Sequence, residues 1–183
     1  MKIYQATVHQ VIALAVIVAS MTSCVDRDRY HIQGEMRGAE GEMVRLVKLD
    51  LATNQQIAVD SCQLSEGLFF FSGDINSPYI HSIKIDGSPG GAHLFLEPGD
   101  FFINGHVDSL GSAIVDGGPT DSLFRSYAVD DLFDEQIGLA IMQNHPNSVL
   151  AAFTAYYHVQ LHPFNADSLT VMVEHMGDEV KSS

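Results

Sequence analysis

The amino-acid sequence predicts a mainly β protein, in which an antiparallel β-sandwich or barrel-like domain is followed by a small C-terminal α-helical segment. Short runs rich in β-branched and aromatic residues recur between residues 30 and 118, separated by Gly, Pro, Asn, Asp and Ser. Two runs flank Glu97-Pro98-Gly99-Asp100, where Pro98 and Gly99 suit the second and third positions of a type II turn, which predicts a β-hairpin. From Thr120 onward, apolar residues instead recur at steps of three and four, as in helices.

The first residues have the features of a secretory signal. Lys2 supplies a positive charge, Val11 to Ala19 is apolar, and small residues precede Cys24. The apolar run has about half of the roughly 20 residues that a membrane-spanning helix needs, so residues 1–23 are expected to be a cleaved signal. Met21-Thr22-Ser23-Cys24 resembles the lipobox of bacterial lipoproteins. An ordinary secretory signal with an incidental cysteine is the alternative.

The lipoprotein resemblance implies that Cys24 is the acylated N-terminus of the mature chain. Several acyl chains give stable membrane anchoring. Residues 24–29 are then a polar tether between the lipid and the folded part. Val25, rather than aspartate, follows the cysteine, which by the enterobacterial sorting rule favours the outer membrane, facing the periplasm.

The charge of the chain excludes some partners. The sequence has 9 basic and 23 acidic residues, a net charge of −14, and removal of Lys2 with the signal makes it −15. Such a chain is repelled by nucleic acids and by anionic lipid surfaces. No nucleic-acid partner is expected, and membrane attachment is expected to come from the lipid rather than from a basic patch.

Residues 30–118 are expected to form the β domain. The predicted strands are 30–37, 42–49, 55–64, 68–75, 79–86, 92–97, 101–107 and 112–116. In Leu68-Phe69-Phe70-Phe71, successive large apolar side chains point to opposite faces. We therefore expect both faces of this strand to be covered, one by the opposing sheet and one by the helices; an exposed aromatic ligand platform is the alternative. The loop 87–91 is interpreted as a hairpin loop rather than a phosphate cradle, because no helix follows it.

Residues 119–183 are expected to be a helical connector. Thr120 or Asp121 is predicted to cap a first helix, along which apolar residues recur at helical spacing: Leu123, Phe124, Tyr127, Leu132, Phe133, Ile137 and Ile141. The intervening carboxylates are interpreted as a solvated face rather than a general acid and base: Asp130, Asp131, Asp134 and Glu135. A second helix is predicted over 147–161, and a third from Ala166 or Asp167.

No sequence motif for a cofactor or a catalytic site is present: no Gly-x-Ser-x-Gly, phosphate loop, Cys-x-x-Cys or EF-hand spacing. His158 and His162 have the spacing of a two-histidine metal site, with Glu174 or His175 as a third ligand. However, Pro163 follows directly and no glutamate adjoins His158. No metal site, cofactor or catalytic residue is therefore predicted. The histidines of the strands are expected to be satisfied or exposed: His31, His81, His93 and His106.

Cys62 is the single thiol left once Cys24 is acylated, so no disulfide framework is expected. A small, buried strand residue is the simpler interpretation. The alternative is a redox thiol that forms a mixed disulfide with a partner. No second cysteine and no nearby Lys or His in the sequence argues for a lowered pKa.

A succession of short motifs resembles an uncharacterised N-terminal domain of exported lipoproteins of the Bacteroidetes. The motifs are His31-Ile32-Gln33-Gly34-Glu35, Val44-Arg45-Leu46, Ile57 to Ser61, Gly67 to Gly73, and Phe95 to Gly105. The segment from His145 to Ala152 resembles the helical connector of the same proteins. In many of them the connector leads into a thioredoxin-like domain with a Cys-x-x-Cys site. This chain ends where that domain would begin, so no catalytic residue is carried over.

These observations lead to three hypotheses about function. The leading hypothesis is a non-catalytic, lipid-anchored protein of the cell envelope whose β domain is an interaction or positioning module. The alternative is an accessory component of a thiol-disulfide redox system, which acts with a separate thioredoxin-like protein through Cys62. A truncated copy without a role is the third, and exposed apolar surface would favour it.

Overall fold

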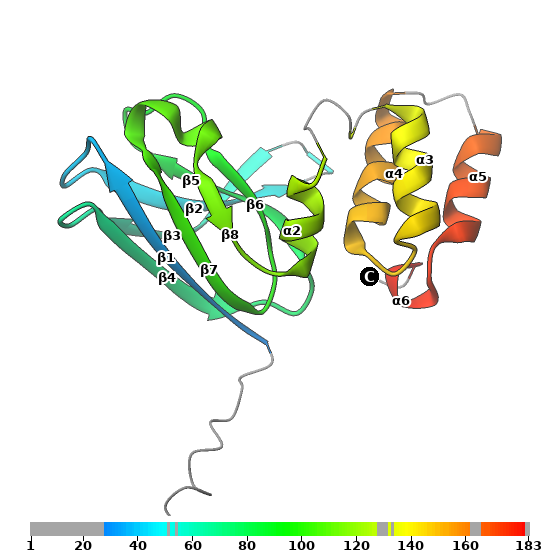
Figure 1. The fold of residues 1–183 in the computed structure, drawn as a ribbon, viewed down its shortest axis with the longest axis horizontal. Helices are drawn as coiled ribbons and strands as arrows, with labels where there is room; N and C mark the ends of the chain where they lie inside the picture. The colour runs from blue at the N-terminus through cyan, green and yellow to red at the C-terminus, as the bar shows by residue number, and fades with distance from the viewer. Residues whose placement is uncertain are drawn as a thin grey trace, which may run out of the picture.

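The computed structural model describes residues 28–50, 52–53, 55–127, 132, 134–161 and 166–181. Two four-stranded sheets face each other as a sandwich, and a group of helices lies beside it (Figure 1). The first sheet has the order β4 (Leu68–Asp74), β1 (Arg29–Arg37), β7 (Gly99–His106) and β8 (Ile114–Asp116). The second has the order β3 (Gln55–Gln63), β2 (Met43–Asp50), β5 (Tyr79–Ile85) and β6 (Ala92–Leu96). The mainly β prediction is confirmed, and the architecture is a sandwich.

The eight predicted strands are present, with ends that differ from the prediction by no more than two residues. The pairs are antiparallel except for β1 and β7, which run parallel. The hairpin predicted around Glu97-Pro98-Gly99-Asp100 is wrong, because β6 belongs to the second sheet and β7 to the first. Pro98 and Gly99, which has a φ of +136°, instead carry the chain from one sheet to the other. The β5–β6 hairpin, with residues 87–91 in its loop, is confirmed.

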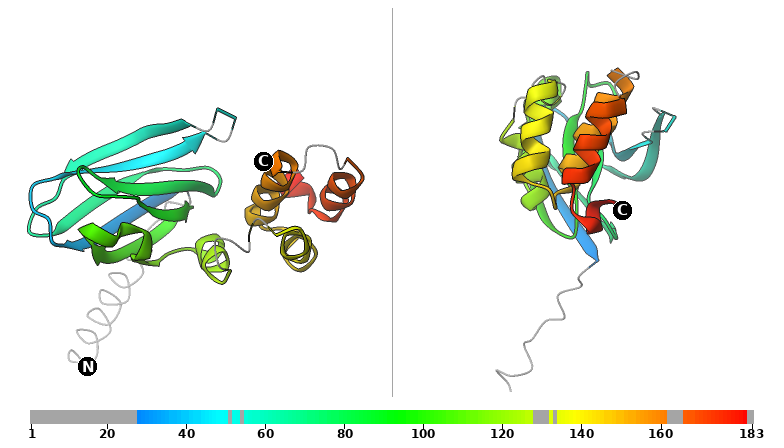
Figure 2. Two further views of the ribbon diagram at one scale, coloured as in Figure 1. Left: turned by 90° about the horizontal axis from the view of Figure 1, so that it is seen from above. Right: turned by 90° about the vertical axis from the view of Figure 1, so that its right-hand side faces the viewer.

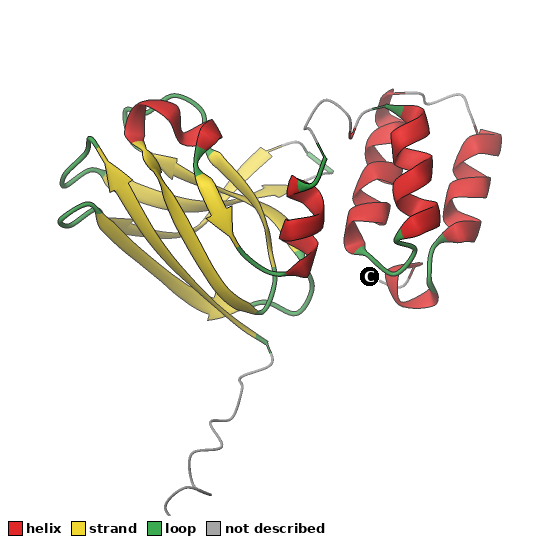
Figure 3. Ribbon diagram, in the orientation of Figure 1, coloured by secondary structure: helices red, strands yellow, loops and turns green. Residues whose placement is uncertain are grey.

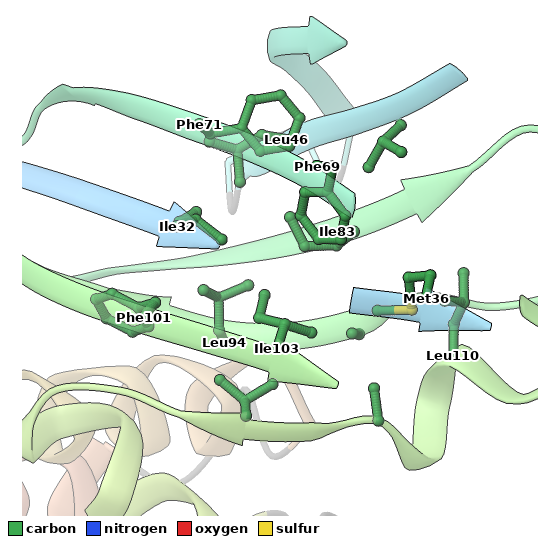
Figure 4. Close-up of a cluster of buried hydrophobic side chains, with 14 of the residues drawn as sticks. Ile32, Met36, Leu46, Phe69, Phe71, Ile83, Leu94, Phe101, Ile103 and Leu110 are labelled. Atoms are coloured by element: carbon green, nitrogen blue, oxygen red, sulfur yellow. The ribbon is translucent and has the colours of Figure 1, made fainter. Parts of the chain in front are cut away.

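The main core lies between the two sheets. Side chains from both layers point toward one another there, among them Ile32, Phe69 and Phe101 from the first sheet and Leu46, Ile83 and Leu94 from the second (Figure 4). Leu110, on the 3₁₀ turn η1 (Val107–Ser112), closes one part of this core. Strand β1 alternates strictly between buried and exposed positions, as expected for a strand with one core face and one open face.

Where the sequence predicted one first helix, from Thr120 or Asp121 to Ile141, the described residues form two helices. The helical region consists of α2 (Pro119–Arg125), α3 (Glu135–Asn144), α4 (Val149–Leu161), α5 (Ala166–His175) and α6 (Asp178–Lys181) (Figure 3). Helix α2 begins after Gly118 with Pro119 in its first turn, so neither Thr120 nor Asp121 is its N-cap. Asp134 caps α3, accepting hydrogen bonds from the backbone N–H groups of Gln136 and Ile137. Among the described residues, no helix has the length and apolar composition needed to cross a membrane.

The helices lie at one side of the sandwich (Figure 2), where α2, α3 and α4 pack against one corner of the second sheet. Ile80 of β5 and Phe95 of β6 form a second apolar cluster there with Phe124, Ile141 and Leu150. The expectation that the helices cover the outer side of Leu68-Phe69-Phe70-Phe71 is therefore wrong. Phe69 and Phe71 are buried between the sheets, whereas Phe70 points outward and is 59% exposed.

Candidate binding face on the first sheet

The outer face of the first sheet carries the candidate site, which we call the outer face. Tyr30, Ile32 and Met36 of β1 point into the core, so the alternating residues His31, Gln33 and Glu35 point outward. No helix described here packs over them. The strand register then fixes which residues of β4, β7 and β8 lie beside them.

Two phenylalanines flank the centre of this face. Gln33 of β1 pairs with Phe70 of β4 on one side and with Phe102 of β7 on the other. Phe70 and Phe102 are 59% and 53% exposed, and Ile114 of β8, which pairs with Asn104 of β7, is 73% exposed. Large apolar side chains gathered on one open face mark interaction sites more often than isolated ones do.

A hollow of about 430 Å³ lies on this face, lined by residues of β1, β4 and β7. Phe70 and Phe102 border it, and in the next row of the sheet His31 lies between Ser72 and Asp100. Its size falls in the range of about 300–1,000 Å³ typical of ligand sites. It therefore combines aromatic rings with an amide, a hydroxyl, an imidazole and a carboxylate.

Carboxylates dominate the charge of this face. Asp100, Asp116 and Glu35 are exposed and form no ion pair with the residues that the structure describes. Arg29, at the edge of the face, lies 3.5 Å from Asp74. A net negative surface with exposed aromatic rings is thus available to a partner.

A second, smaller hollow of about 200 Å³ lies between β5 and α4. Its lining is mostly apolar and includes Tyr79, Phe95, Phe153 and Tyr156. This volume is below the usual range of ligand sites. We interpret it as incomplete packing between the helices and the sandwich.

The outer face lies in a part of the sequence that matches a protein family. Residues 30–124, just over half of the chain, match a family described as Domain of unknown function (DUF4369). The chain belongs to the DUF4369 family. The predicted resemblance to an uncharacterised domain is confirmed. Among curated proteins, none matches the chain.

The DUF4369 match runs from β1 into α2, so it spans both sheets and the outer face. It ends before α3, so that helices α3 to α6 lie beyond it. The predicted division into a β domain at 30–118 and a connector at 119–183 stays a prediction. The parts predicted as a signal, 1–23, and the lipidation residue Cys24 lie outside the described residues.

The link between α2 and the β6 edge is built from buried polar groups. Asp121, fully buried, accepts hydrogen bonds from the backbone N–H of Phe95 at 2.9 Å and from Arg125 Nε at 2.7 Å. Burial raises the pKa of the Asp121 carboxyl, and the hydrogen bond from Arg125 opposes this shift. Glu97 accepts from both the backbone N–H and the hydroxyl of Thr120. The residues predicted as helix caps thus tie the helix to the sheet instead.

Cys62 lies on β3, the edge strand beside β4, and is partly buried against the main core. Burial raises the pKa of its thiol above the ordinary value, a hydrogen bond from the backbone of Phe70 lowers it, and the charge of Asp60 raises it further. A raised pKa leaves less thiolate, which is the reactive form. The local chemistry therefore lends no support to the redox interpretation of Cys62, which stays a hypothesis.

The four strand histidines occupy different places. His81 is buried with Nδ1 2.9 Å from the carbonyl oxygen of Tyr79, and His106 Nδ1 accepts a hydrogen bond from the Asp108 N–H. His93 contacts Ser82, and His31 is exposed. The prediction that they are satisfied or exposed is confirmed.

Of the residues with metal-site spacing in the sequence, which was not taken to predict a metal site, His162 lies outside the described residues and so does the side chain of His175. His158 is buried, with Nε2 4.0 Å from Glu135 Oε1, and Glu174 is exposed. Within the described part of the chain, no group of three or more His, Cys, Asp or Glu side chains is arranged to hold a metal ion. Of the predicted acidic helix face, Asp134 and Glu135 are described and Asp130 and Asp131 are not.

Ser82 and His93 form a pair that the sequence did not predict. The Ser82 hydroxyl lies 2.6 Å from His93 Nδ1 across the β5–β6 hairpin. A nucleophile needs a base that is itself oriented by a third group. Burial lowers the pKa of His93, and the charges of Lys84 and Arg125 lower it further. No carboxylate in the described part of the chain hydrogen-bonds to His93, so we interpret the pair as a cross-strand structural contact.

Sequence reasoning also missed Gln33 and Asp100 as residues of the outer face. Asp100 was interpreted as a turn residue, and Gln33 was named only within the motif His31-Ile32-Gln33-Gly34-Glu35. The parallel pairing of β1 with β7 brings Gln33 and Asp100 together, and no local sequence pattern predicts this pairing. Phe70 was recognised as the basis for an aromatic platform, and its exposure is what that alternative required.

Proposed function

We propose that the chain is a non-catalytic interaction module of the cell envelope, which presents its outer face to a partner protein. The observation that carries this proposal is the exposed pair Phe70 and Phe102 over a hollow that no described helix covers. Aromatic side chains are enriched in protein interfaces and among the residues that contribute most to binding. The paired strands fix the backbone positions of both phenylalanines, which lowers the entropy cost of binding.

Attachment to the membrane is the second part of the proposal. The basis is the sequence from Lys2 to Cys24, in which an apolar run is followed by a lipobox-like segment. The net charge of −14 opposes electrostatic binding to anionic lipids, so acyl chains on Cys24 would supply the attachment. We place the protein on the outer membrane, facing the periplasm, as in the exported lipoproteins of the Bacteroidetes that it resembles.

Metabolic labelling with an alkynyl palmitate tests the anchor. The wild-type chain should incorporate the label and fractionate with membranes, and Cys24→Ala should do neither. Labelling of Cys24→Ala at the wild-type level would contradict the anchor. Release of the wild-type chain in soluble form would support the ordinary secretory signal instead.

Photo-crosslinking in the cells that make the protein tests the interaction. Benzoylphenylalanine in place of Gln33, at the centre of the outer face, should give a discrete protein adduct. The same group in place of Ile57, exposed on β3 of the other sheet, is the matched control and should not. Absence of an adduct from position 33, or the same adducts from both positions, would contradict the proposal.

A turnover assay tests the non-catalytic part. The arrangement closest to a catalytic pair is Ser82 with His93. The purified chain should have no hydrolytic activity toward ester and peptide substrates that depends on either residue. Activity that is lost in both Ser82→Ala and His93→Gln would contradict this part.

A further inference from the structure

We infer that the surface recognised by the outer face is basic, and that an arginine or lysine side chain of the partner protein occupies the hollow that Phe70 and Phe102 border. This inference rests on the proposed function and adds the chemistry of the partner to it. It follows from the two aromatic rings that border the hollow, from the charges beside them and from the polar groups in the hollow.

Two aromatic rings, those of Phe70 and Phe102, border the hollow and can attract a cation. Phe70 and Phe102 pair with the same residue, Gln33, from the strands on either side of β1. Neighbouring strands are about 4.8 Å apart, so the backbones of the two phenylalanines lie roughly 9.6 Å apart, with the Gln33 side chain in the same row between them. The room for a cation is in the adjoining row, where His31, Ser72 and Asp100 line the hollow and both phenylalanines border it. An aromatic ring attracts a cation that lies within about 6 Å of its centre.

The charges of the outer face also favour a basic partner. Asp100 lies in the hollow itself, and Asp116 pairs with Phe102 in the same row of the sheet. Glu35 lies in the following row, beside Asn104. None of the three carboxylates forms an ion pair with a described residue. The basic residues of the face are at its margins: Arg29 lies beside Asp74 and Arg37 is in the last row of β1.

Other kinds of partner surface fit less well. An anionic surface would be repelled by these carboxylates and by the net charge of −14. A purely apolar surface would bury Asp100 and Gln33 without hydrogen-bond partners, which is costly. A guanidinium group suits both the aromatic rings and the polar groups of the hollow, because its flat face stacks on aromatic rings while its N–H groups donate hydrogen bonds to a carboxylate. Arginine is therefore expected to bind more tightly than lysine.

Binding of short peptides to the full chain, purified in mild detergent, tests this inference. The chain contains no tryptophan, so a tryptophan at the end of each peptide reports binding by its fluorescence without background. Four peptides of equal length carry two residues each of arginine, lysine, glutamine or glutamate, separated by glycine. At pH 7.5 the arginine peptide should bind most tightly, the lysine peptide less tightly, and the glutamine and glutamate peptides at least ten times more weakly than arginine.

Two pairs of variants locate the binding. Binding of the arginine peptide should weaken at least tenfold in the double variant Phe70→Ser/Phe102→Ser. It should also weaken at least tenfold in the single variant Asp100→Asn. The matched controls are on exposed β3: Ile57→Ser with Val59→Ser for the rings, and Asp60→Asn for the carboxylate. These should change binding less than twofold. Circular dichroism confirms that each variant is folded.

The inference is overturned if the arginine and glutamine peptides bind equally, if the β3 controls weaken binding as much as the outer-face variants, or if no peptide binds. If position 33 gives an adduct but the arginine peptide does not bind, the interaction module is supported and the basic partner is contradicted. Absence of both would remove both proposals.

Discussion

Gly34 and Phe69 show how a single residue type makes room for the core. Gly34 lies on the core side of β1, opposite Phe69 of β4, and the ring of Phe69 occupies the space where a β-carbon of residue 34 would lie. This contact gives a physical reason for the glycine in the motif His31-Ile32-Gln33-Gly34-Glu35. The ring in turn is one of the largest fully buried side chains of the sandwich.

Gly34→Ala is therefore expected to destabilise the protein by about 1–3 kcal/mol, as overpacking of a filled core does. Urea unfolding measures the change. Gly111→Ala is the matched control, because no atom lies within 4 Å of the added β-carbon there. Equal free energies of unfolding for the two variants would contradict the proposed role of Gly34.

His81 is expected to make stability depend on pH. Burial lowers the pKa of this histidine below its ordinary value of 6.5; the hydrogen bond to the Tyr79 carbonyl opposes the shift, and the charge of Lys48 adds to it. As the pH falls, the unfolded chain binds the proton first, which favours unfolding. The contribution of a neutral His81 is thus complete above pH 6.5 and is lost as the pH falls through the lower pKa of the folded state.

Urea unfolding at pH 7.5 and 5.5 measures this effect. His81→Gln should lose less stability between these two values than the wild-type chain does. His31→Gln, whose ring is exposed, should behave like the wild type. An unchanged pH dependence in His81→Gln would contradict the account.

At the scale of elements, α2 protects the edge of the second sheet. β6 is the edge strand, and the backbone N–H of Phe95 donates to Asp121 rather than to another strand. An uncovered edge N–H would be open to water and to pairing with other chains. The buried carboxylate therefore satisfies a donor that the sheet cannot.

Asp121→Ala should expose this donor and cost about 1–3 kcal/mol, the range for leaving a buried hydrogen-bonding group unsatisfied. Hydrogen exchange followed by NMR should show faster exchange at the Phe95 amide in this variant. Asp178→Ala, at an exposed position on α6, is the control and should leave that amide protected. Exchange at the wild-type rate in Asp121→Ala would contradict the role of Asp121.

The elements that the sequence predicted well are those whose signals are local. Alternating apolar residues and turn residues predicted the strands, because both act over a few neighbouring positions. The break between α2 and α3 was missed, because Leu123, Phe124, Leu132, Ile137 and Ile141 keep helical spacing across it. The hairpin at Glu97 to Asp100 was wrong for a related reason, since the turn chemistry does not determine which sheet receives the next strand.

The outer face was only partly predictable for the same physical reason. The run of three phenylalanines predicted a large side chain on each face of the strand, but the leading expectation was that helices cover the outer one, and only the alternative left it exposed. Phe102 and the carboxylate of Asp100 come together with Phe70 through the β1–β7 pairing, between segments about seventy residues apart. Contacts of this kind depend on the topology of the whole sandwich.

At the scale of the whole molecule, the helices and the outer face are on different parts of the sandwich. Helices α2, α3 and α4 cover a corner of the second sheet, whereas no helix among the described residues covers the aromatic face of the first sheet. This separation lets a partner bind without displacing the helices. It also separates the binding face from most of the polar contacts that hold α2 in place.

The thiol chemistry of Cys62 discriminates between the interaction module and the redox alternative. Since burial raises the pKa of Cys62, its reaction with a disulfide reagent at pH 8 should be slower than that of free cysteine. The rate should rise when the chain is unfolded in urea. Reaction faster than that of free cysteine in the folded protein would favour the redox system.

The central claim is that the outer face binds a partner. The most direct test is quantitative co-purification from the cells that make the protein, in mild detergent and with thiols alkylated. We compare the wild-type chain with Phe70→Ser/Phe102→Ser and with the matched β3 variant Ile57→Ser/Val59→Ser. We expect the partner to be recovered with the wild type and with the β3 variant, and its recovery to fall at least tenfold with the outer-face variant. Equal recovery with all three chains would contradict the account.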